Sequence, residues 1–304
     1  MSIAQSSRTG STVAGIAWMV ATTFCFVIVT GIVRYLGTDI AAVEAAFIRY
    51  AFGLLIFLPM MRPLIRNMPP ARRVGTYALR GLVHSIGVML WFYAMARIPI
   101  AEVTALGYTA PIFVAIGAAI FFGEKLHIRR IAAVLIGFLG TLLILRPGFN
   151  EIGPGQIAQL MAAPMFAISF LFAKRLTEDE DPVMIVVWLS IFCTLFLLPG
   201  AVINWSNPTL SEVFWLAMTA IFATLGHYTM TRAIQAAPLT VTQPVGFLQL
   251  VWATALGILV FNEAMDPFVL IGGGIIIAAI TFISHREAIA ARRQITPPAP
   301  ATRD

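Results

Sequence analysis

Ten runs of roughly twenty apolar residues, separated by short polar stretches, constrain this chain more than any other feature. A helix needs about 20 apolar residues to cross the hydrocarbon core of a bilayer. Within that core only helices and closed barrels satisfy all of their backbone hydrogen bonds. The sequence therefore predicts an all-α integral membrane protein with ten transmembrane helices, at residues 13–35, 41–61, 75–96, 100–122, 128–146, 154–176, 182–203, 212–235, 239–262 and 267–284.

Composition excludes a water-soluble fold. Hydrophobic residues make up 59% of the 304 residues and charged residues only 11%, against about 25% charged in a typical soluble domain. The net charge of +6 suggests nucleic-acid binding at first sight. The basic residues lie between the apolar runs, however, and form no continuous basic face, so we expect no nucleic-acid partner.

The chain carries no recognisable catalytic or metal-binding motif. Cys25 and Cys193 lie in separate apolar runs, with no C-x-x-C spacing and no neighbouring histidine, so packing is their expected role and no metal site is predicted. The H-E-x-x-H, G-x-S-x-G and phosphate-loop patterns are absent from the sequence. We therefore expect no catalytic residues, no cofactor and no enzymatic activity.

Lysine and arginine in the short loops predict the orientation, because cytoplasmic loops carry an excess of these residues. If the N-terminus is cytoplasmic, most of the basic loop residues lie on the inner side, and the outer segments hold only Arg34, Arg97 and Arg146. We therefore predict a multi-pass protein of a bacterial-type inner membrane, with both termini in the cytoplasm. Oligomeric state is not indicated.

The chain also contains an internal repeat. A shift of 139 residues superposes identical residues in the two halves: Ala94 on Ala233, Pro99 on Pro238, Gly107 on Gly246, Phe122 on Phe261 and Glu124 on Glu263. Five helices per half is an odd number, so the second half enters the membrane with the opposite orientation. The predicted division is a cytoplasmic segment 1–12, repeats at 13–148 and 149–284, and a cytoplasmic disordered tail at 285–304.

Two stretches resemble a known family. They are WFYAMARIPIAEVTALGYTAPIFVAIGAAIFFGEKLHIRRIAAVLIGFLGTLLILRPG at 91–148 and RAIQAAPLTVTQPVGFLQLVWATALGILVFNE at 232–263. The proline turn, the helix of small residues, the terminal glutamate and the glycine-rich helix that follows resemble the ten-helix EamA-type branch of the drug/metabolite transporter superfamily. The resemblance covers nearly the whole chain. The second half departs from the pattern where Leu250 stands in place of a counterpart of Pro111.

The resemblance implies a central cavity between the halves, alternating access, and a small polar or heteroaromatic metabolite as substrate. The run from Arg80 to Pro111 is most similar to carriers for riboflavin or S-adenosylmethionine uptake. Export of amino acids or drugs, and a membrane receptor that does not transport, are the alternatives. The expected partners are a small-molecule substrate, the lipid bilayer and a coupling proton.

Polar and aromatic residues at membrane depth are the candidate substrate contacts, because burying such groups in lipid is costly. Arg49 suits a substrate carboxylate or phosphate, and an ion pair within the protein is the equal alternative. Tyr108 and Trp252 offer stacking surfaces. Gln243, Gln249 and His84 offer hydrogen bonds, although such residues also join helices.

Four ionisable residues are candidates for proton coupling. They are Glu44, His84, Glu102 and His227. Histidine suits this role because its charge changes near neutral pH. For His84 and His227 a hydrogen bond to a neighbouring helix is the simpler reading. For Glu102 the simpler reading is capping of the helix in whose first turn it stands.

Overall fold

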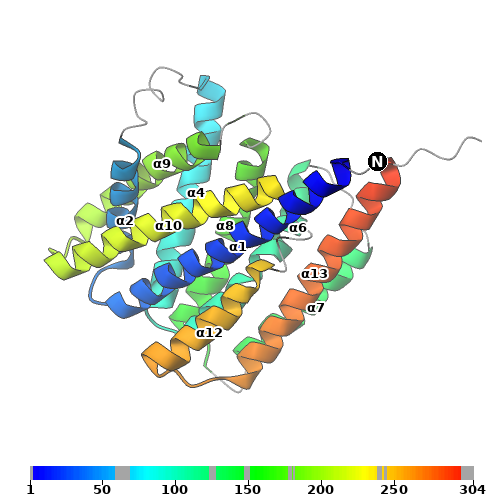
Figure 1. Cartoon of the computed structure of the whole chain (residues 1–304). Helices are drawn as coiled ribbons and strands as arrows, with labels where there is room; N and C mark the ends of the chain where they lie inside the picture. The colour runs from blue at the N-terminus through cyan, green and yellow to red at the C-terminus, as the bar shows by residue number, and fades with distance from the viewer. Residues whose placement is uncertain are drawn as a thin grey trace, which may run out of the picture.

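The computed structural model describes residues 3–58, 69–122, 128–146, 151–176, 180, 182–237, 242 and 245–295. These residues form helices joined by loops, with no strand among them (Figure 1). The helices are α1 (Ile3–Leu36), α2 (Ala42–Ile56), α4 (Ala71–Met95), α5 (Ile100–Gly107), α6 (Ala110–Phe122), α7 (Ile128–Leu145), α8 (Pro154–Leu176), α9 (Pro182–Ile203), α10 (Leu210–Ala236), α12 (Leu248–Phe261) and α13 (Pro267–Ile295).

Each predicted span contains at least part of one of these helices, but their lengths differ. Five described stretches are long and apolar enough to cross a membrane: Val13–Leu36, Ala71–Met95, Pro154–Ala173, Val183–Ile203 and Leu210–Ala233. Shorter apolar stretches cover Ile100–Val114, Val134–Leu145, Leu248–Phe261 and Pro267–Phe282. Many large apolar side chains, such as Ile120, Leu139 and Leu259, are exposed on the outside. Lipid chains would cover such a surface, which water-soluble proteins rarely present.

The fourth predicted span is two helices rather than one. α5 ends at Gly107 and α6 begins at Ala110, because Pro111 has no backbone N–H and its ring excludes the carbonyl four residues earlier. In the break, the amide of Thr109 donates to the carbonyl of Leu106 at 3.0 Å. The Thr109 hydroxyl donates to the same oxygen at 2.7 Å. These two bonds satisfy polar groups that the broken helix leaves free.

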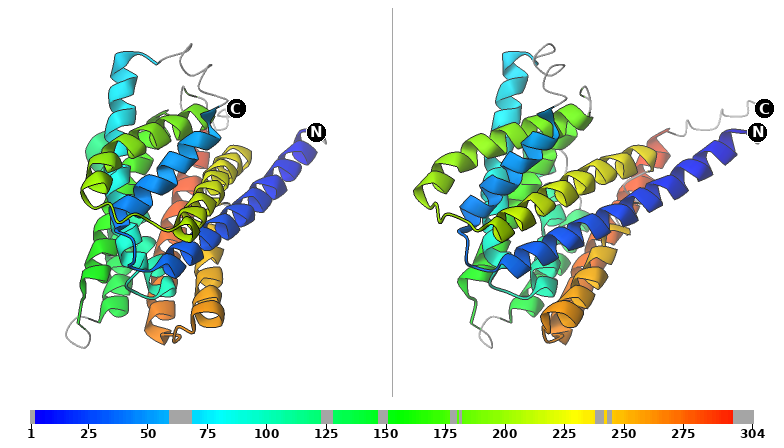
Figure 2. Two further views of the ribbon diagram at one scale, coloured as in Figure 1. Left: turned by 90° about the vertical axis from the view of Figure 1, so that its left-hand side faces the viewer. Right: turned by 60° about the vertical axis from the view of Figure 1, so that its left-hand side comes forward.

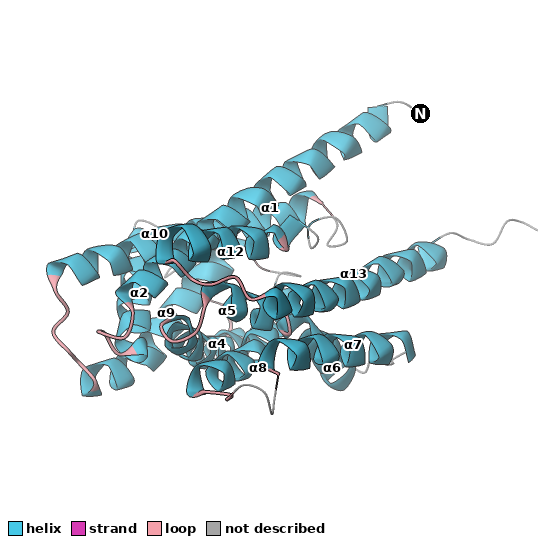
Figure 3. Cartoon of the chain, turned by 90° about the horizontal axis from the view of Figure 1, so that it is seen from below, coloured by secondary structure: helices cyan, strands magenta, loops and turns pink. Residues whose placement is uncertain are grey.

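The helices pack in pairs that reflect the repeat. α1 packs along α10 and α4 along α8, while α2 packs with α9, α5 with α12 and α7 with α13. In the repeat, α1 corresponds to α8, α2 to α9, α4 to α10 and α7 to α13, and the fourth predicted span, which holds α5 and α6, corresponds to the ninth, which holds α12. Exchanging each span with its counterpart turns the α1–α10 pair into the α8–α4 pair and leaves the other three pairs of spans unchanged. In Figure 3, α2 and α9 lie on the left and α7 and α13 on the right. The two halves are therefore arranged as an inverted pair around the α5–α12 contact.

Tyr108 and Phe247, one each from the two halves, meet at this contact. Their rings are 5.1 Å apart in an edge-to-face arrangement, and the Tyr108 hydroxyl lies 3.5 Å from the Phe247 carbonyl oxygen. The two positions are 139 residues apart, which is the offset of the internal repeat. Equivalent positions of the two repeats therefore touch each other, as expected beside a pseudo-two-fold axis.

Glycines bring the backbones of α7 and α13 into contact. A Cβ atom added at Gly272 would lie 2.6 Å from the carbonyl oxygen of Gly140, and one added at Gly140 would lie 2.8 Å from that of Gly272. Close approach at small residues is a common source of helix association in membranes, where lipid removes the usual hydrophobic drive.

The face opposite the termini is tied together by charged residues. The start of α1 and the end of α13 lie on one side of the molecule (Figure 2). On the other side, Arg34 of α1 forms an ion pair with Glu263 at 2.9 Å, and Glu263 also accepts a hydrogen bond from the Ile100 amide at 2.9 Å. Arg146 pairs with Asp266 nearby. Both ion pairs join the first half of the chain to the second.

Candidate functional site

A central cavity of about 300 Å³ lies among helices of both halves. This volume is at the lower end of the range for small-molecule pockets, about 300–1,000 Å³. Its walls come from α1, α2 and α4 of the first half and from α8, α10 and α12 of the second. The lining residues are Phe26, Val29, Thr30, Arg49, Tyr50, His84, Val88, Trp91, Phe92, Phe166, Ala223, His227 and Gln249.

Arg49 is the charged residue of this cavity. It is 8% exposed, and its guanidinium carbon lies 4.2 Å from the centre of the Tyr50 ring, a favourable cation–π geometry. Its Nη1 atom forms no hydrogen bond of normal geometry with the described residues, and the neighbouring Tyr50 hydroxyl interacts with both the guanidinium and Cys193. The ion pairs given by the described residues join Arg34, Arg73 and Arg146 to carboxylates and do not include Arg49.

His84 and His227, two of the coupling candidates, meet in the cavity. Their rings, from α4 and α10, have centroids 6.3 Å apart. Each also contacts a phenylalanine edge-to-face at 5.3 Å, His84 with Phe166 and His227 with Phe26. Nδ1 of His84 lies 3.0 Å from the hydroxyl oxygen of Ser169 on α8. The structure thus brings together two residues that are 143 positions apart in the sequence.

Of the remaining substrate-binding candidates, one lines the cavity and others do not. Gln249 lines the cavity, whereas Tyr108 and Trp252 are not among its lining residues. Tyr108 is engaged with Phe247 at the α5–α12 contact, and the Trp252 ring stacks on Phe24 of α1 at 4.9 Å. Gln243 lies outside the described residues.

The two glutamates proposed for coupling lie away from the cavity. Glu44 is completely buried and accepts hydrogen bonds from the amide and the hydroxyl of Ser206, at 3.1 and 2.8 Å. Glu102 accepts a hydrogen bond from Gln156 at 3.1 Å and borders a separate polar hollow of about 360 Å³, beside Arg146. Each carboxylate thus bonds to a residue far away in the sequence and holds two segments of the chain together.

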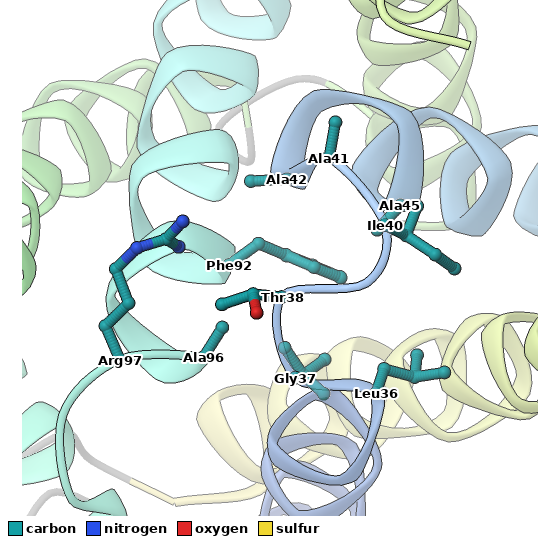
Figure 4. A pocket seen from close by; sticks show the side chains of 11 residues that line it. Leu36, Gly37, Thr38, Ile40, Ala41, Ala42, Ala45, Phe92, Ala96 and Arg97 are labelled. Atoms are coloured by element: carbon teal, nitrogen blue, oxygen red, sulfur yellow. The ribbon is translucent and has the colours of Figure 1, made fainter. Parts of the chain in front are cut away.

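A smaller cavity of about 60 Å³ lies beside the loop between α1 and α2. Figure 4 shows its lining, which is mostly small or apolar side chains with Arg97 at the edge. The Arg97 guanidinium carbon lies 3.6 Å from the centre of the Tyr93 ring, and its Nη1 donates to the Tyr93 carbonyl oxygen at 3.1 Å. This cavity is too small for a metabolite. The polar hollow beside Glu102 is lined by loops and helix ends, whereas the central cavity is lined by residues within helices of both halves, so the central cavity is the candidate site.

Sequence reasoning missed the phenylalanines of the site. Phe26 packs against Gly226, and Phe166 packs against Gly87. Phe26 and Phe166 are 140 residues apart, and Gly87 and Gly226 are 139 apart, so the same contact between the two halves occurs twice. Extending the repeat alignment to the first and sixth spans would have paired the two phenylalanines only if the shift were increased by one residue, to 140.

Comparison with known proteins establishes the class of this protein. The EamA-like transporter family matches residues 13–146 and again residues 153–285. The chain belongs to the EamA-like transporter family. The expected superfamily and two-repeat helical membrane fold are thereby confirmed, and the protein is a multi-pass membrane transporter.

Several curated relatives of this EamA-family member are full-length matches. An S-adenosylmethionine uptake transporter of Rickettsia bellii is 28% identical, over 86% of this chain and 90% of the relative. A riboflavin transporter of Vibrio cholerae is 28% identical, over 92% and 96%. Another, of Rhizobium johnstonii, is 30% identical, over 90% and 92%.

A solved structure supports the fold. A protein of known crystal structure superposes with a TM-score of 0.54 at 18% sequence identity, covering 95% of this chain and 99% of the other. At this level of identity the likeness concerns the fold alone.

Proposed function

We propose that this protein is a secondary transporter that carries a small polar or heteroaromatic metabolite across a bacterial inner membrane by alternating access. The observation behind this proposal is the position of the central cavity, whose walls come from both halves of an inverted repeat. Rocking of two such halves exposes a shared site to each side of the membrane in turn. Carriage of this kind requires no covalent chemistry, so we infer that the protein is not an enzyme.

The proposed organisation follows the sequence expectations except in the C-terminal tail, where α13 continues to Ile295 into the segment expected to be disordered. The repeats are residues 13–148 and 149–284, and the segments 1–12 and 285–304 are cytoplasmic. Support comes from the basic residues near the termini, including Arg286, Arg292 and Arg293. Reporter domains fused to either end should both be cytoplasmic; a periplasmic reporter at one end would refute this topology.

Riboflavin and S-adenosylmethionine are the first substrates to test, because relatives along most of the chain transport them. Both contain a flat heteroaromatic ring, which suits the aromatic walls of the cavity. Of the sequence candidates, Arg49, His84 and Gln249 are the proposed substrate contacts that line this cavity. His84 and His227 are the proposed coupling pair, with a proton as the coupling ion.

Counterflow in proteoliposomes tests the proposal. Vesicles loaded with unlabelled riboflavin or S-adenosylmethionine should accumulate the labelled compound transiently, since an alternating-access carrier exchanges its substrate across the membrane. Protein-free vesicles are the control. Binding of either compound without exchange would instead favour a membrane receptor.

Export is the second candidate, and one relative favours it. A pseudopaline exporter of Pseudomonas aeruginosa is 25% identical, over 90% of this chain and 96% of the relative. Whole cells that express the protein separate the two directions. An importer raises the internal level of the labelled substrate, whereas an exporter lowers it in preloaded cells.

A further inference from the structure

The central cavity contains a buried positive charge, and the described residues that line it include no negative charge. Arg49 is 8% exposed, and no carboxylate is among the described lining residues. Glu44, on the same helix, is held by Ser206, and Glu263 is held by Arg34. These two carboxylates are thus already engaged elsewhere.

The guanidinium is also incompletely hydrogen-bonded. Nη1 of Arg49 is buried and forms no hydrogen bond of normal geometry with the described residues, although the Tyr50 hydroxyl interacts with the guanidinium. Arg80, which is similarly buried, lies outside the cavity lining; its Nη1 donates to the Ile185 carbonyl oxygen at 3.1 Å, while its Nε has no partner among the described residues. Leaving a buried donor unsatisfied is costly. A guanidinium fork binds carboxylate and phosphate groups especially well, so an anion on the substrate would satisfy Arg49.

Two phenylalanine rings, one from each half, form matching walls of the same cavity. A Cβ atom at Gly226 would lie 3.0 Å from the Phe26 ring, and one at Gly87 would lie 3.1 Å from the Phe166 ring. Each glycine therefore allows a ring to rest directly on the backbone of the neighbouring helix. Each ring then meets one of the two histidines edge-to-face at 5.3 Å. Such flat apolar walls suit an aromatic ring of the substrate.

We propose, on the basis of the proposed transport function, that the substrate carries a carboxylate or phosphate beside a flat ring. Arg49 anchors the anionic group, and Phe26 and Phe166 form the walls that receive the ring. The anion supplies the missing partner of Nη1. Carboxylate and phosphate share this chemistry, and matched compounds separate them.

Pairs of compounds that differ by one anionic group test the inference. The first pair is S-adenosylmethionine and its decarboxylated form, and the second is riboflavin 5′-phosphate and riboflavin. Dissociation constants are measured by calorimetry on the full chain in detergent. We expect the member that carries the carboxylate or phosphate to bind about 10- to 100-fold more tightly than its partner in at least one pair, as a charge-assisted hydrogen bond implies. Preference within the first pair indicates a carboxylate, and preference within the second a phosphate.

Substitutions assign this preference to Arg49. R49Q should abolish this preference, chiefly by weakening the binding of the member that carries the anionic group, and R49K should retain part of the preference. R97Q is the matched control, because it removes the same charge from an exposed residue outside the central cavity and should leave the preference intact. In the pair that shows the preference, F166A should weaken the binding of both members to a similar extent.

Equal affinity of the wild-type protein for both members of each pair would overturn the inference, and this comparison requires no variant to fold. Equal weakening of both members by R49Q would also overturn it, since Arg49 would then act only in packing. Counterflow separates this failure from failure of the transport proposal. Exchange without anion preference refutes only the substrate class, whereas anion preference without exchange of any probe refutes only transport.

Discussion

Gly87 determines where the Phe166 ring lies in the central cavity. We expect G87A to lower the free energy of unfolding by about 1–3 kcal/mol, as overpacking usually does, and to weaken ligand binding because the ring must move. Thermal unfolding in detergent and ligand titration measure the two effects. G75A on the same helix is the matched control, because nothing lies within 4 Å of the position that its Cβ would occupy.

Alanine at position 75 should be neutral or stabilising by up to about 1 kcal/mol, given its higher helix propensity. If G87A and G75A had the same effect on thermal unfolding and on ligand binding, Gly87 would not be needed to position the Phe166 ring.

Glu44 is expected to act in stability rather than in coupling. Its carboxylate accepts hydrogen bonds from the amide and hydroxyl of Ser206, and it does not line the central cavity. E44Q should therefore cost about 1–3 kcal/mol of stability without changing the pH profile of uptake by the remaining folded protein. H227N is the comparison variant and should change that profile. A stable E44Q protein with an altered profile would return Glu44 to the coupling pathway.

The pairing of α7 with α13 depends on contact between their backbones. G272A would place a Cβ atom 2.6 Å from the Gly140 carbonyl oxygen, so the two helices must separate or shift. We expect a lower unfolding temperature and weaker protection from proteolysis near this crossing. G274A lies two residues away on α13, where nothing is within 4 Å of an added Cβ. The G274A variant should unfold at the same temperature as the wild type. If G272A and G274A lowered the unfolding temperature equally, the close approach of the two backbones would be excluded as the cause.

At the scale of the whole molecule, ion pairs between the halves join the face opposite the termini. We expect breaking Arg34–Glu263 to favour opening on this face. In a background without Cys25 and Cys193, A223C places one thiol in the wall of the central cavity. An impermeant maleimide added from the face opposite the termini should label it several-fold faster when E263Q is also present.

The exchange of charges R34E/E263R, which restores an ion pair, should return the labelling rate toward that of the A223C parent. Labelling that is unaffected by E263Q would show that this pair does not limit opening.

The amino-acid sequence by itself determined the membrane fold, the family and the depth of the polar residues. Apolar runs of sufficient length leave the backbone no alternative to helices in lipid, and an arginine at that depth must find a special environment. The sequence alone therefore identifies Arg49, His84 and His227 as cavity candidates. The break between α5 and α6 at Pro111 was not predicted from the sequence.

Only the tertiary structure decided which way each side chain faces. Helices in lipid are apolar on every side, so the sequence pattern that marks the buried face of a soluble helix is weak. For this reason the sequence suggested Trp252 as a substrate contact from its depth alone. In the structure its ring lies against Phe24 and does not line the cavity. Phe26 and Phe166 became cavity walls because glycines on distant helices receive their rings. Such contacts depend on how the two halves pack, which local sequence does not specify.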